Sequence, residues 1–255
     1  MSATPTLLGS RALVNPSKDH TQGQKSAQLG FVQKTLGLVA AQLVLTAAVC
    51  GLVVLNSTVR NYTVATWNEG SWHTAASFVF PVIFLVTSFA CQHRHPINLL
   101  SLFLFTLSSA WSVARVCALL YEAEFGQSIA QAALLTAFTV VGLALFALRS
   151  KHDFSYMRAG LFVVLLTFCA STTIALVFQC AGWSYPHLFH HAVGVLLFSL
   201  YLIFDVHQLS TTMSVDDYIP AAISIYIDIL NLFVHILSFL VEMALKHEEK
   251  KNDEK

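Results

Sequence analysis

Long runs without Asp, Glu, Lys or Arg dominate this chain of 255 residues. An α-helix rises about 1.5 Å per residue, so a run of about 20 residues can cross the roughly 30 Å hydrocarbon core of a bilayer. A helix also satisfies its own backbone hydrogen bonds, as lipid requires. Four such runs of 20 to 25 residues lie between Lys34 and Arg60, Glu69 and Arg94, Arg94 and Arg115, and Glu124 and Arg149.

The second half of the chain adds three more predicted spans. The 46 uncharged residues between Arg158 and Asp205 are too many for one crossing, and the Gly- and Pro-containing stretch from Cys180 to His187 divides them into two helices. A last apolar segment runs from about Ile219 to Leu245. The predicted spans are therefore 34–55, 73–92, 97–120, 129–149, 157–179, 187–208 and 219–245.

This pattern predicts an all-α fold, a seven-helix membrane bundle over residues 31–245. Residues 1–30 are expected to form a disordered polar segment without the apolar core of a signal peptide, and residues 246–255 a charged tail. The composition agrees, because 56% of the residues are hydrophobic and only 11% are charged, against about 25% in soluble domains. The 14 basic and 14 acidic residues balance, which excludes nucleic acid as an expected partner.

The distribution of basic residues predicts a cytosolic N-terminus. With that orientation Arg60 is the one basic residue in the opposite loops, and the side of the lysine-containing tail stays open. The two N-x-S/T sequons, at Asn56 and Asn61, then fall in the first lumenal loop as candidate glycosylation sites. The basic residues placed inside are Arg11, Lys18, Lys25, Lys34, Arg94, Arg149, Lys151 and Arg158.

A polar stripe runs along the seventh predicted span. Its members follow one another at steps of three or four residues and therefore share one helical face. Such a face cannot be exposed to lipid, so it either packs as a hydrogen-bonded seam or lines water. The stripe consists of Ser224, Asp228, Asn231, His235, Ser238 and Glu242.

The sixth span repeats this spacing at His187, His191, Gly194, Phe198, Tyr201, Asp205 and Gln208. Within that set Phe198 is either a plug or an ordinary core aromatic. The connection to the seventh span is short, so the two helices must be antiparallel neighbours. Asp205 and Asp228 then lie near the same cytosolic end, with Asp228 about 7 Å deeper by residue count.

Two carboxylates in a site of low dielectric constant are expected to share a proton and titrate as a pair. This gives either a pH-sensitive contact or a structural one. Arg94, in the loop before the third span, is a candidate latch for the acids or a plain positive-inside anchor. Arg115 is expected to snorkel to the lumenal interface.

These residues resemble the transmembrane Bax inhibitor motif family, most closely its lifeguard branch. The segment from Ser199 to Asp205 is similar to the family's sixth-helix pattern Leu-Tyr-x-x-x-Asp. The segment from Asp217 to Phe233 is similar to the seventh-helix pattern Leu-Tyr-x-Asp-x-x-Asn-x-Phe. Weaker matches at 31–34, 41–46, 95–100 and 105–106 extend the resemblance from about Phe31 to Leu245.

The resemblance implies a bundle whose last helix is surrounded by the other six. It also implies a pH-sensitive calcium leak in an intracellular membrane, with Asp205 and Asp228 at the sensor positions, and protection from stress-induced cell death. Calcium is then a permeating ion and a transient ligand of the two acids, with no cofactor expected. Membrane lipids and cell-death regulators are the other expected partners. The endoplasmic reticulum or Golgi is the expected location, with the plasma membrane as the alternative.

Some positions depart from the family pattern. Ser109 and Ala110 stand where lifeguard proteins carry an acidic residue and Gly, and Gln33 and Leu36 replace Arg and Tyr. A rival interpretation is a seven-helix membrane zinc hydrolase, because the HxxxH spacing of His187 and His191 places two imidazoles on one helical face. The sequence offers no acid from a neighbouring span at that depth, so a channel rather than an enzyme is the leading expectation.

Overall fold

The computed structural model describes residues 16–68, 72–150, 152, 154–182, 187–214 and 216–253. Several residues used above lie outside this part of the chain, among them Arg11, Glu69 and Lys151. The described residues form eight α-helices, and seven of them are long and apolar enough to span a membrane. The predicted fold class is therefore confirmed. The helices are α1 Pro16–Leu55, α2 Ser57–Asn68, α3 Trp72–Ala90, α4 Ile97–Glu122, α5 Gly126–Arg149, α6 Met157–Cys180, α7 His187–Thr211 and α8 Tyr218–Asp253.

The observed helices differ from the predicted spans mainly at their ends. Helix α1 begins at Pro16, well before the predicted span 34–55. Helix α8 continues through the charged tail to Asp253. In both places a polar segment extends a helix that is already nucleated inside the membrane, which avoids the cost of starting a new one.

Helix α2 has no counterpart among the predicted elements. Its 12 residues occupy the stretch expected to be the first lumenal loop and carry the second sequon, while the first begins one residue before it. The Oδ1 atom of Asn56 accepts hydrogen bonds from the backbone N–H groups of Thr58 and Val59, at 3.1 and 3.3 Å. Asn56 therefore caps the N-terminus of α2, a role for which its side chain is well suited.

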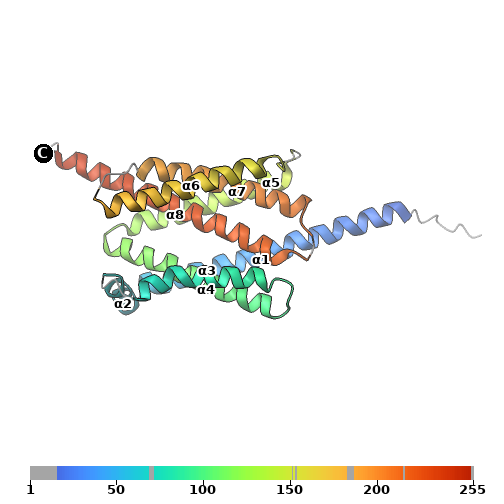
Figure 1. Cartoon of the computed structure of the whole chain (residues 1–255), viewed down its shortest axis with the longest axis horizontal. Coiled ribbons are helices and arrows are strands. Elements are labelled where there is room, and N and C mark those ends of the chain that lie inside the picture. Colours follow the sequence, from blue (N-terminus) through green and yellow to red (C-terminus); the bar gives the residue numbers. More distant parts are fainter. Residues whose placement is uncertain are drawn as a thin grey trace, which may run out of the picture.

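Helix α8 lies in the middle of the bundle (Figure 1), where it contacts α1, α3, α4, α5 and α7. Helix α6 packs along α7 and reaches α8 through Phe168, whose ring centroid lies 5.3 Å from that of His235. Leu232 and Ile223 of α8 are fully buried between the other helices. The arrangement matches the expectation that the last helix is surrounded by the other six.

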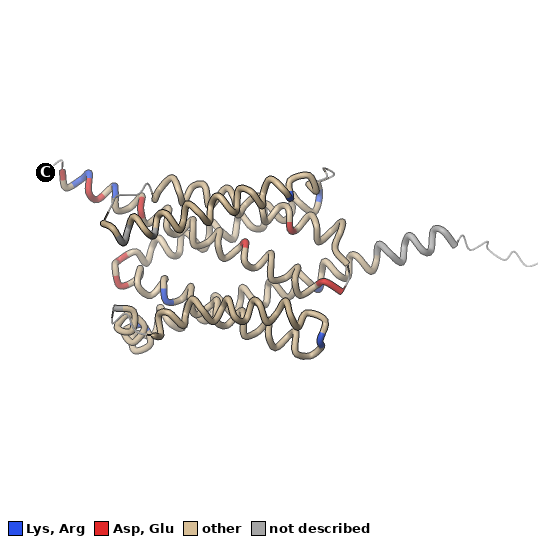
Figure 2. The backbone as a smooth tube through the Cα atoms, viewed as in Figure 1, with Lys and Arg blue, Asp and Glu red and all other residues tan. Residues whose placement is uncertain are grey.

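The two ends of the bundle carry different elements (Figure 1). One end, called here the α2 end, holds α2, the connection between α4 and α5, and the C-terminal end of α8. The opposite end holds the start of α1, the α3–α4 loop and the connection between α7 and α8. Charged residues gather toward these two ends and are sparse between them (Figure 2). Helix α8 thus crosses the whole bundle.

Hydrogen bonds between polar side chains tie α1 to α4 and α8 inside the bundle. The Nε2 atom of Gln42 donates to Oγ1 of Thr106 at 2.8 Å, and the hydroxyl groups of Thr46 and Tyr226 lie 2.7 Å apart. Each pair joins groups that would otherwise be costly to bury in an apolar environment. Helix α8 is therefore positioned by α1 on one side and by α7, as described next, on another.

Candidate functional site

The structure brings Asp205 of α7 and Asp228 of α8 together. The two carboxyl groups are close enough to interact directly. Asp228 is only 5% exposed, and its Oδ2 atom is buried without a hydrogen-bond partner. The packing of α7 against α8 therefore brings together two acids that a residue count places at different depths.

Apolar side chains surround this acid pair. Leu202 and Val206 of α7 and Ile225 and Ile229 of α8 are all buried in the same core cluster. Tyr201, one turn before Asp205, is near enough to interact electrostatically with both acids. The acid pair is therefore largely removed from water.

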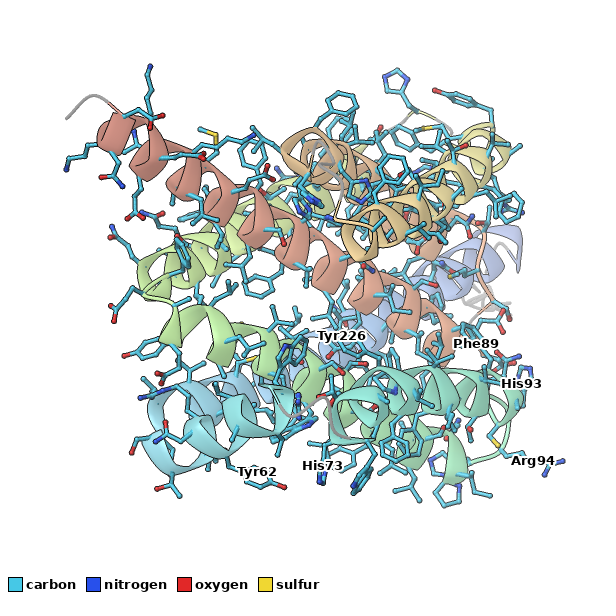
Figure 3. The ribbon with its side chains drawn as sticks, turned by 60° about the vertical axis from the view of Figure 1, so that its left-hand side comes forward. Tyr62, His73, Phe89, His93, Arg94 and Tyr226 are labelled. Atoms are coloured by element: carbon cyan, nitrogen blue, oxygen red, sulfur yellow. The ribbon has the colours of Figure 1, made fainter. Side chains whose placement is uncertain are left out.

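No cation among the described residues pairs with these acids. The salt bridges in this part of the chain join Arg60 to Glu122 and Lys246 to Glu242. Arg94, the candidate latch, is exposed on the α3–α4 loop and points away from the bundle (Figure 3). Within the described residues no salt bridge joins Arg94 to Asp205 or Asp228, so the structure does not bring Arg94 to the acid pair.

Phe198 lies two turns from Asp205 toward the α2 end, between α7 and its neighbours. It is 7% exposed, and its ring stacks on that of His235 with centroids 5.6 Å apart and an interplanar angle of 14°. Phe168 packs edge-on against it, at 6.1 Å. A Cβ atom on Gly194 would lie 2.6 Å from the ring of His235, so a glycine lets the two helices approach here. The Phe198 and His235 rings close the seam between α7 and α8.

The histidines of the rival zinc site have other contacts. The Nδ1 atom of His191 lies 3.2 Å from Nδ1 of His235, and the ring of His190 stacks on Phe168 at 4.4 Å. Within the described residues, no three His, Cys, Asp or Glu side chains are grouped as metal ligands. The structure therefore adds no third ligand to His187 and His191 in the part of the chain it describes.

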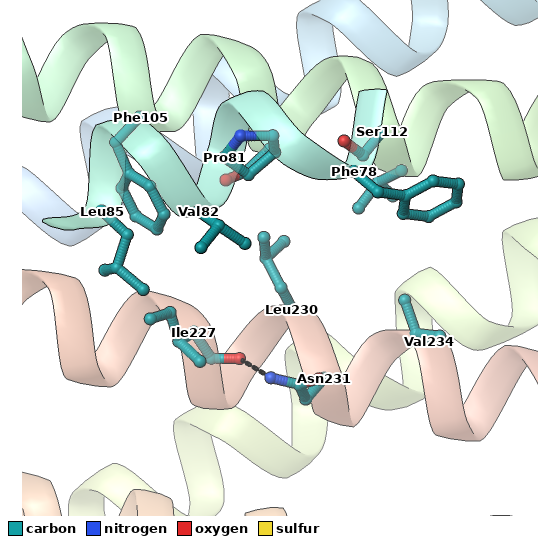
Figure 4. A pocket seen from close by; sticks show the side chains of 12 residues that line it. Phe78, Pro81, Val82, Leu85, Phe105, Ser112, Ile227, Leu230, Asn231 and Val234 are labelled. Carbon is teal, nitrogen blue, oxygen red and sulfur yellow. Dashed lines mark hydrogen bonds between the residues drawn. The ribbon is translucent and has the colours of Figure 1, made fainter. Parts of the chain in front are cut away.

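The rest of the polar stripe divides between two surroundings. Asp228 and His235 face α7, while Asn231 lines a cavity of about 360 Å³ between α3, α4 and α8 (Figure 4). The Nδ2 atom of Asn231 donates to the backbone oxygen of Ile227 at 2.9 Å. Ser224 is half-buried. Oε1 of Glu242 lies 3.3 Å from Nζ of Lys246, and its Oε2 is buried without a partner. The stripe is a packed seam along part of its length and borders a cavity along another part.

Arg115 does not snorkel as expected. It is 1% exposed and donates hydrogen bonds to the hydroxyl oxygens of Thr66 and Thr74, at 3.4 and 3.0 Å. The missed helix α2 supplies Thr66, which explains the error. The hydrogen-bonded residues Gln42, Thr46, Thr106 and Tyr226 lie within the family-like segments, but no role was assigned to them from the sequence, because each is a single polar residue in an apolar run.

Comparison with known proteins places this bundle in a family. A family model described as inhibitor of apoptosis-promoting Bax1 matches residues 28–244, which contain five of the seven spans whole and most of the first and last. The chain belongs to the Bax inhibitor family.

Curated relatives cover most of this Bax inhibitor family member. Protein lifeguard 4 of Mus musculus is 33% identical over 216 residues, covering 84% of this chain and 85% of that protein. Protein LIFEGUARD 1 of Arabidopsis thaliana is 31% identical, covering 82% and 88%. The Golgi anti-apoptotic protein of vaccinia virus is also 31% identical, covering 84% and 85%. The resemblance noted from the sequence is thereby confirmed at the family level.

Proposed function

We propose that this Bax inhibitor family member is a pH-sensitive calcium leak channel of an intracellular membrane, with Asp205 and Asp228 as its sensor. The observation that carries the proposal is the close approach of the half-buried Asp205 to the buried Asp228, a pair that no described cation neutralises. Two buried carboxylates without a counter-ion cannot both ionise cheaply, so the pair holds one proton over some range of pH.

The protonation state of the pair sets the contact between α7 and α8. With one proton, an O–H···O⁻ hydrogen bond joins the helices, and such charge-assisted bonds are among the stronger ones in proteins. Loss of that proton leaves two negative charges facing each other in a poorly solvated place, which drives the helices apart or recruits calcium. A second proton removes the charge and weakens the bond. Flux is therefore expected to pass through a minimum at intermediate pH.

The residues along the seam are suited to a calcium leak. Calcium binds oxygen ligands, and conduction needs sites that bind weakly enough to release the ion. Two carboxyl groups near one end, the amide of Asn231 beside a cavity, and Glu242 nearer the other end supply oxygens at separated depths. The stacked rings of Phe198 and His235 lie between the acid pair and Glu242, so separation of α7 from α8 is the motion that opens the path.

The names of the relatives support the cellular part of the proposal. The vaccinia virus relative is called a Golgi anti-apoptotic protein, and the family model is described by inhibition of apoptosis-promoting Bax1. We infer that this chain acts against cell death from a Golgi or endoplasmic reticulum membrane. We further infer that it does so as a channel and not as an enzyme, with calcium as the ion carried.

Calcium flux into liposomes across pH 5 to 8 tests the channel. The purified full chain is compared with Asp205→Asn, Asp228→Asn and the double variant. Each single variant is expected to flatten the pH response. The double variant should add little, since residues that act as one unit are not additive. Asp216→Asn is the matched control, because Asp216 is an exposed acid on the connection between the same two helices. It should keep the wild-type profile.

Two results would overturn the proposal. Wild-type pH dependence that survives in both single variants would return the acid pair to a structural role. Absence of calcium flux from folded wild-type protein at every pH would remove the channel itself. Circular dichroism and size-exclusion chromatography on each variant establish that the bundle is folded before flux is compared.

A further inference from the structure

Arg115 is a buried cation that no described acid neutralises. It lies on α4, about 10 Å along the helix from Glu122 at the α2 end. Its hydrogen-bond acceptors are the neutral hydroxyl groups of Thr66 and Thr74, whose own protons go to backbone oxygens. The ring of Trp67 lies 5.5 Å from the guanidinium carbon. Among the described residues, the groups that contact the Arg115 guanidinium are therefore hydroxyl groups and an aromatic ring, all uncharged.

Donor capacity is left over on the guanidinium group. An arginine side chain carries five N–H donors, and the two threonines use two of them. The Nε atom is buried and has no hydrogen-bond partner. The edge formed by Nε and one terminal nitrogen is the edge that receives a carboxylate or phosphate in bidentate fashion. An anion at this edge would neutralise the charge and complete the hydrogen bonds together.

Arg115 borders a cavity of about 470 Å³ between α1, α2, α3 and α4. The cavity is polar at one end and apolar at the other. Near Arg115 it is lined by Tyr62 and His73, which lie on α2 and at the start of α3 (Figure 3). Toward the middle of the bundle it is lined by Phe80, Phe84 and Leu104. Leu104 is about 16 Å along α4 from Arg115, so the apolar part extends well into the membrane.

The cavity is also open to the surroundings of the bundle. Trp72 and Phe80, which line it on α3, are 70% and 48% exposed. In a bilayer the surroundings at that depth are lipid, with headgroups near the helix ends and acyl chains below them. The polar end of the cavity therefore lies at the depth of the lipid headgroups, and its apolar part lies at the depth of the acyl chains.

We propose that this cavity binds an anionic membrane lipid, with a carboxylate or phosphate group held by Arg115 and an acyl chain between α3 and α4. Its volume falls within the range of about 300 to 1,000 Å³ typical of small-molecule sites. Lipid in the leaflet at the α2 end is the occupant. The site is separate from the acid pair, which lies on α7 and α8.

Tryptophan fluorescence provides a direct test, because Trp72 and Trp111 line the cavity and Trp67 contacts Arg115. Full-chain protein is reconstituted in phosphatidylcholine vesicles containing small amounts of a lipid brominated on its acyl chain. Brominated phosphatidic acid or oleate is expected to quench at lower mole fraction than brominated phosphatidylcholine. The phosphate and carboxylate arms show which headgroup the site prefers. Quenching that is equal for all three lipids would overturn the proposal.

Three variants locate the site. Arg115→Gln should lower the affinity of the cavity for the anionic lipid about tenfold, because one charge-assisted contact is lost. Ala76→Phe keeps Arg115 but fills the cavity from α3, and should also abolish the preference. Arg60→Gln removes an arginine at the same end that is already paired with Glu122, and should leave the preference unchanged. An unaltered preference in folded Arg115→Gln and Ala76→Phe proteins would overturn the proposal.

Competing anions are tested in the same assay. Glu69, outside the described residues, is the nearest acid along the chain to Thr66 and Trp67. If it neutralises Arg115, the wild type shows no lipid preference and Glu69→Gln creates one, which would overturn the proposal. Inorganic phosphate should not displace the brominated lipid at millimolar concentration. Displacement by phosphate would indicate a site for a small anion and would also overturn it.

Discussion

Gly194 sets how closely α7 approaches α8 beside the His235 ring. A Cβ atom at this position would meet three ring atoms of His235, at 2.6 to 2.8 Å. The ring cannot swing aside freely, because Phe198 stacks on it, Phe168 packs against it, and His191 contacts its Nδ1 atom. The absence of a side chain at Gly194 therefore allows α7 and α8 to pack closely in this part of the seam.

We expect Gly194→Ala to destabilise the folded bundle by about 1 to 3 kcal/mol, the usual cost of overpacking a well-filled core. Thermal unfolding followed by size-exclusion chromatography in detergent measures the change. Gly142→Ala on α5 is the control, since nothing lies within 4 Å of the added carbon. That change should be neutral or should stabilise the helix by up to about 1 kcal/mol. Equal stability of the two variants would contradict the close approach.

At the scale of elements, α1 holds α4 and α8 through hydrogen bonds that have no equivalent in an all-apolar interface. Thr46 donates to the backbone oxygen of Gln42 in its own helix and lies 2.7 Å from the hydroxyl of Tyr226. Tyr226 is fully buried and packs edge-on against Phe105 of α4, with centroids 5.8 Å apart. One tyrosine thus connects the central helix to two others.

We expect Tyr226→Phe to cost about 0.5 to 1.5 kcal/mol, because it removes one buried hydrogen bond and keeps the ring in place. Thr46→Val should cost a similar amount, and the double variant less than the sum, since both changes break the same bond. Thermal unfolding of the four proteins gives the coupling energy. Thr87→Val is the control, because the exposed Thr87 hydroxyl bonds only within α3, to Ile83. Strict additivity would show that the two hydroxyl groups do not interact.

At the scale of the whole molecule, the seven crossings separate the two termini. Helix α1 starts at one end of the bundle, and α8 finishes at the other, beside α2 (Figure 1). The charged turns of α8 that contain Lys250 and Lys251 are therefore on the same side of the membrane as the sequons at Asn56 and Asn61. The positive-inside rule then predicts that this side is lumenal.

We expect an N-terminal epitope to be digested by protease added to sealed microsomes, while a C-terminal epitope is protected. Detergent should expose both, which controls for intrinsic resistance. The loop that precedes α4 provides an internal check. His93→Cys is introduced into a chain whose own cysteines are replaced by alanine. A cysteine-reactive label that cannot cross the membrane should then reach this position from the cytosolic side. Protection of the N-terminal epitope in sealed vesicles would reverse the assigned orientation. Protection of neither end would contradict the odd number of crossings.

The number of spans, their approximate limits and the end at which both acids lie all follow from the amino-acid sequence alone. These properties are local, because lipid requires each crossing to be a long apolar helix and short connections force neighbours to be antiparallel. The contact between Asp205 and Asp228, by contrast, depends on how α7 packs against α8. That packing depends on side chains along the whole interface, among them Gly194 and Phe198.

The surroundings of the arginines are a property of the tertiary packing. Arg94 was a candidate partner for the acids, yet it lies on an exposed loop and points away from the bundle (Figure 3). Arg115 was expected at the interface, yet helix α2 covers it and supplies Thr66. A side chain's burial depends on which distant segments fold over it, and one charged residue at the end of an apolar run carries no local pattern that reveals them. The approximate depth of each residue in the membrane follows from its position along an apolar run. The partners of its side chain, by contrast, depend on the packing of helices that are far apart in sequence.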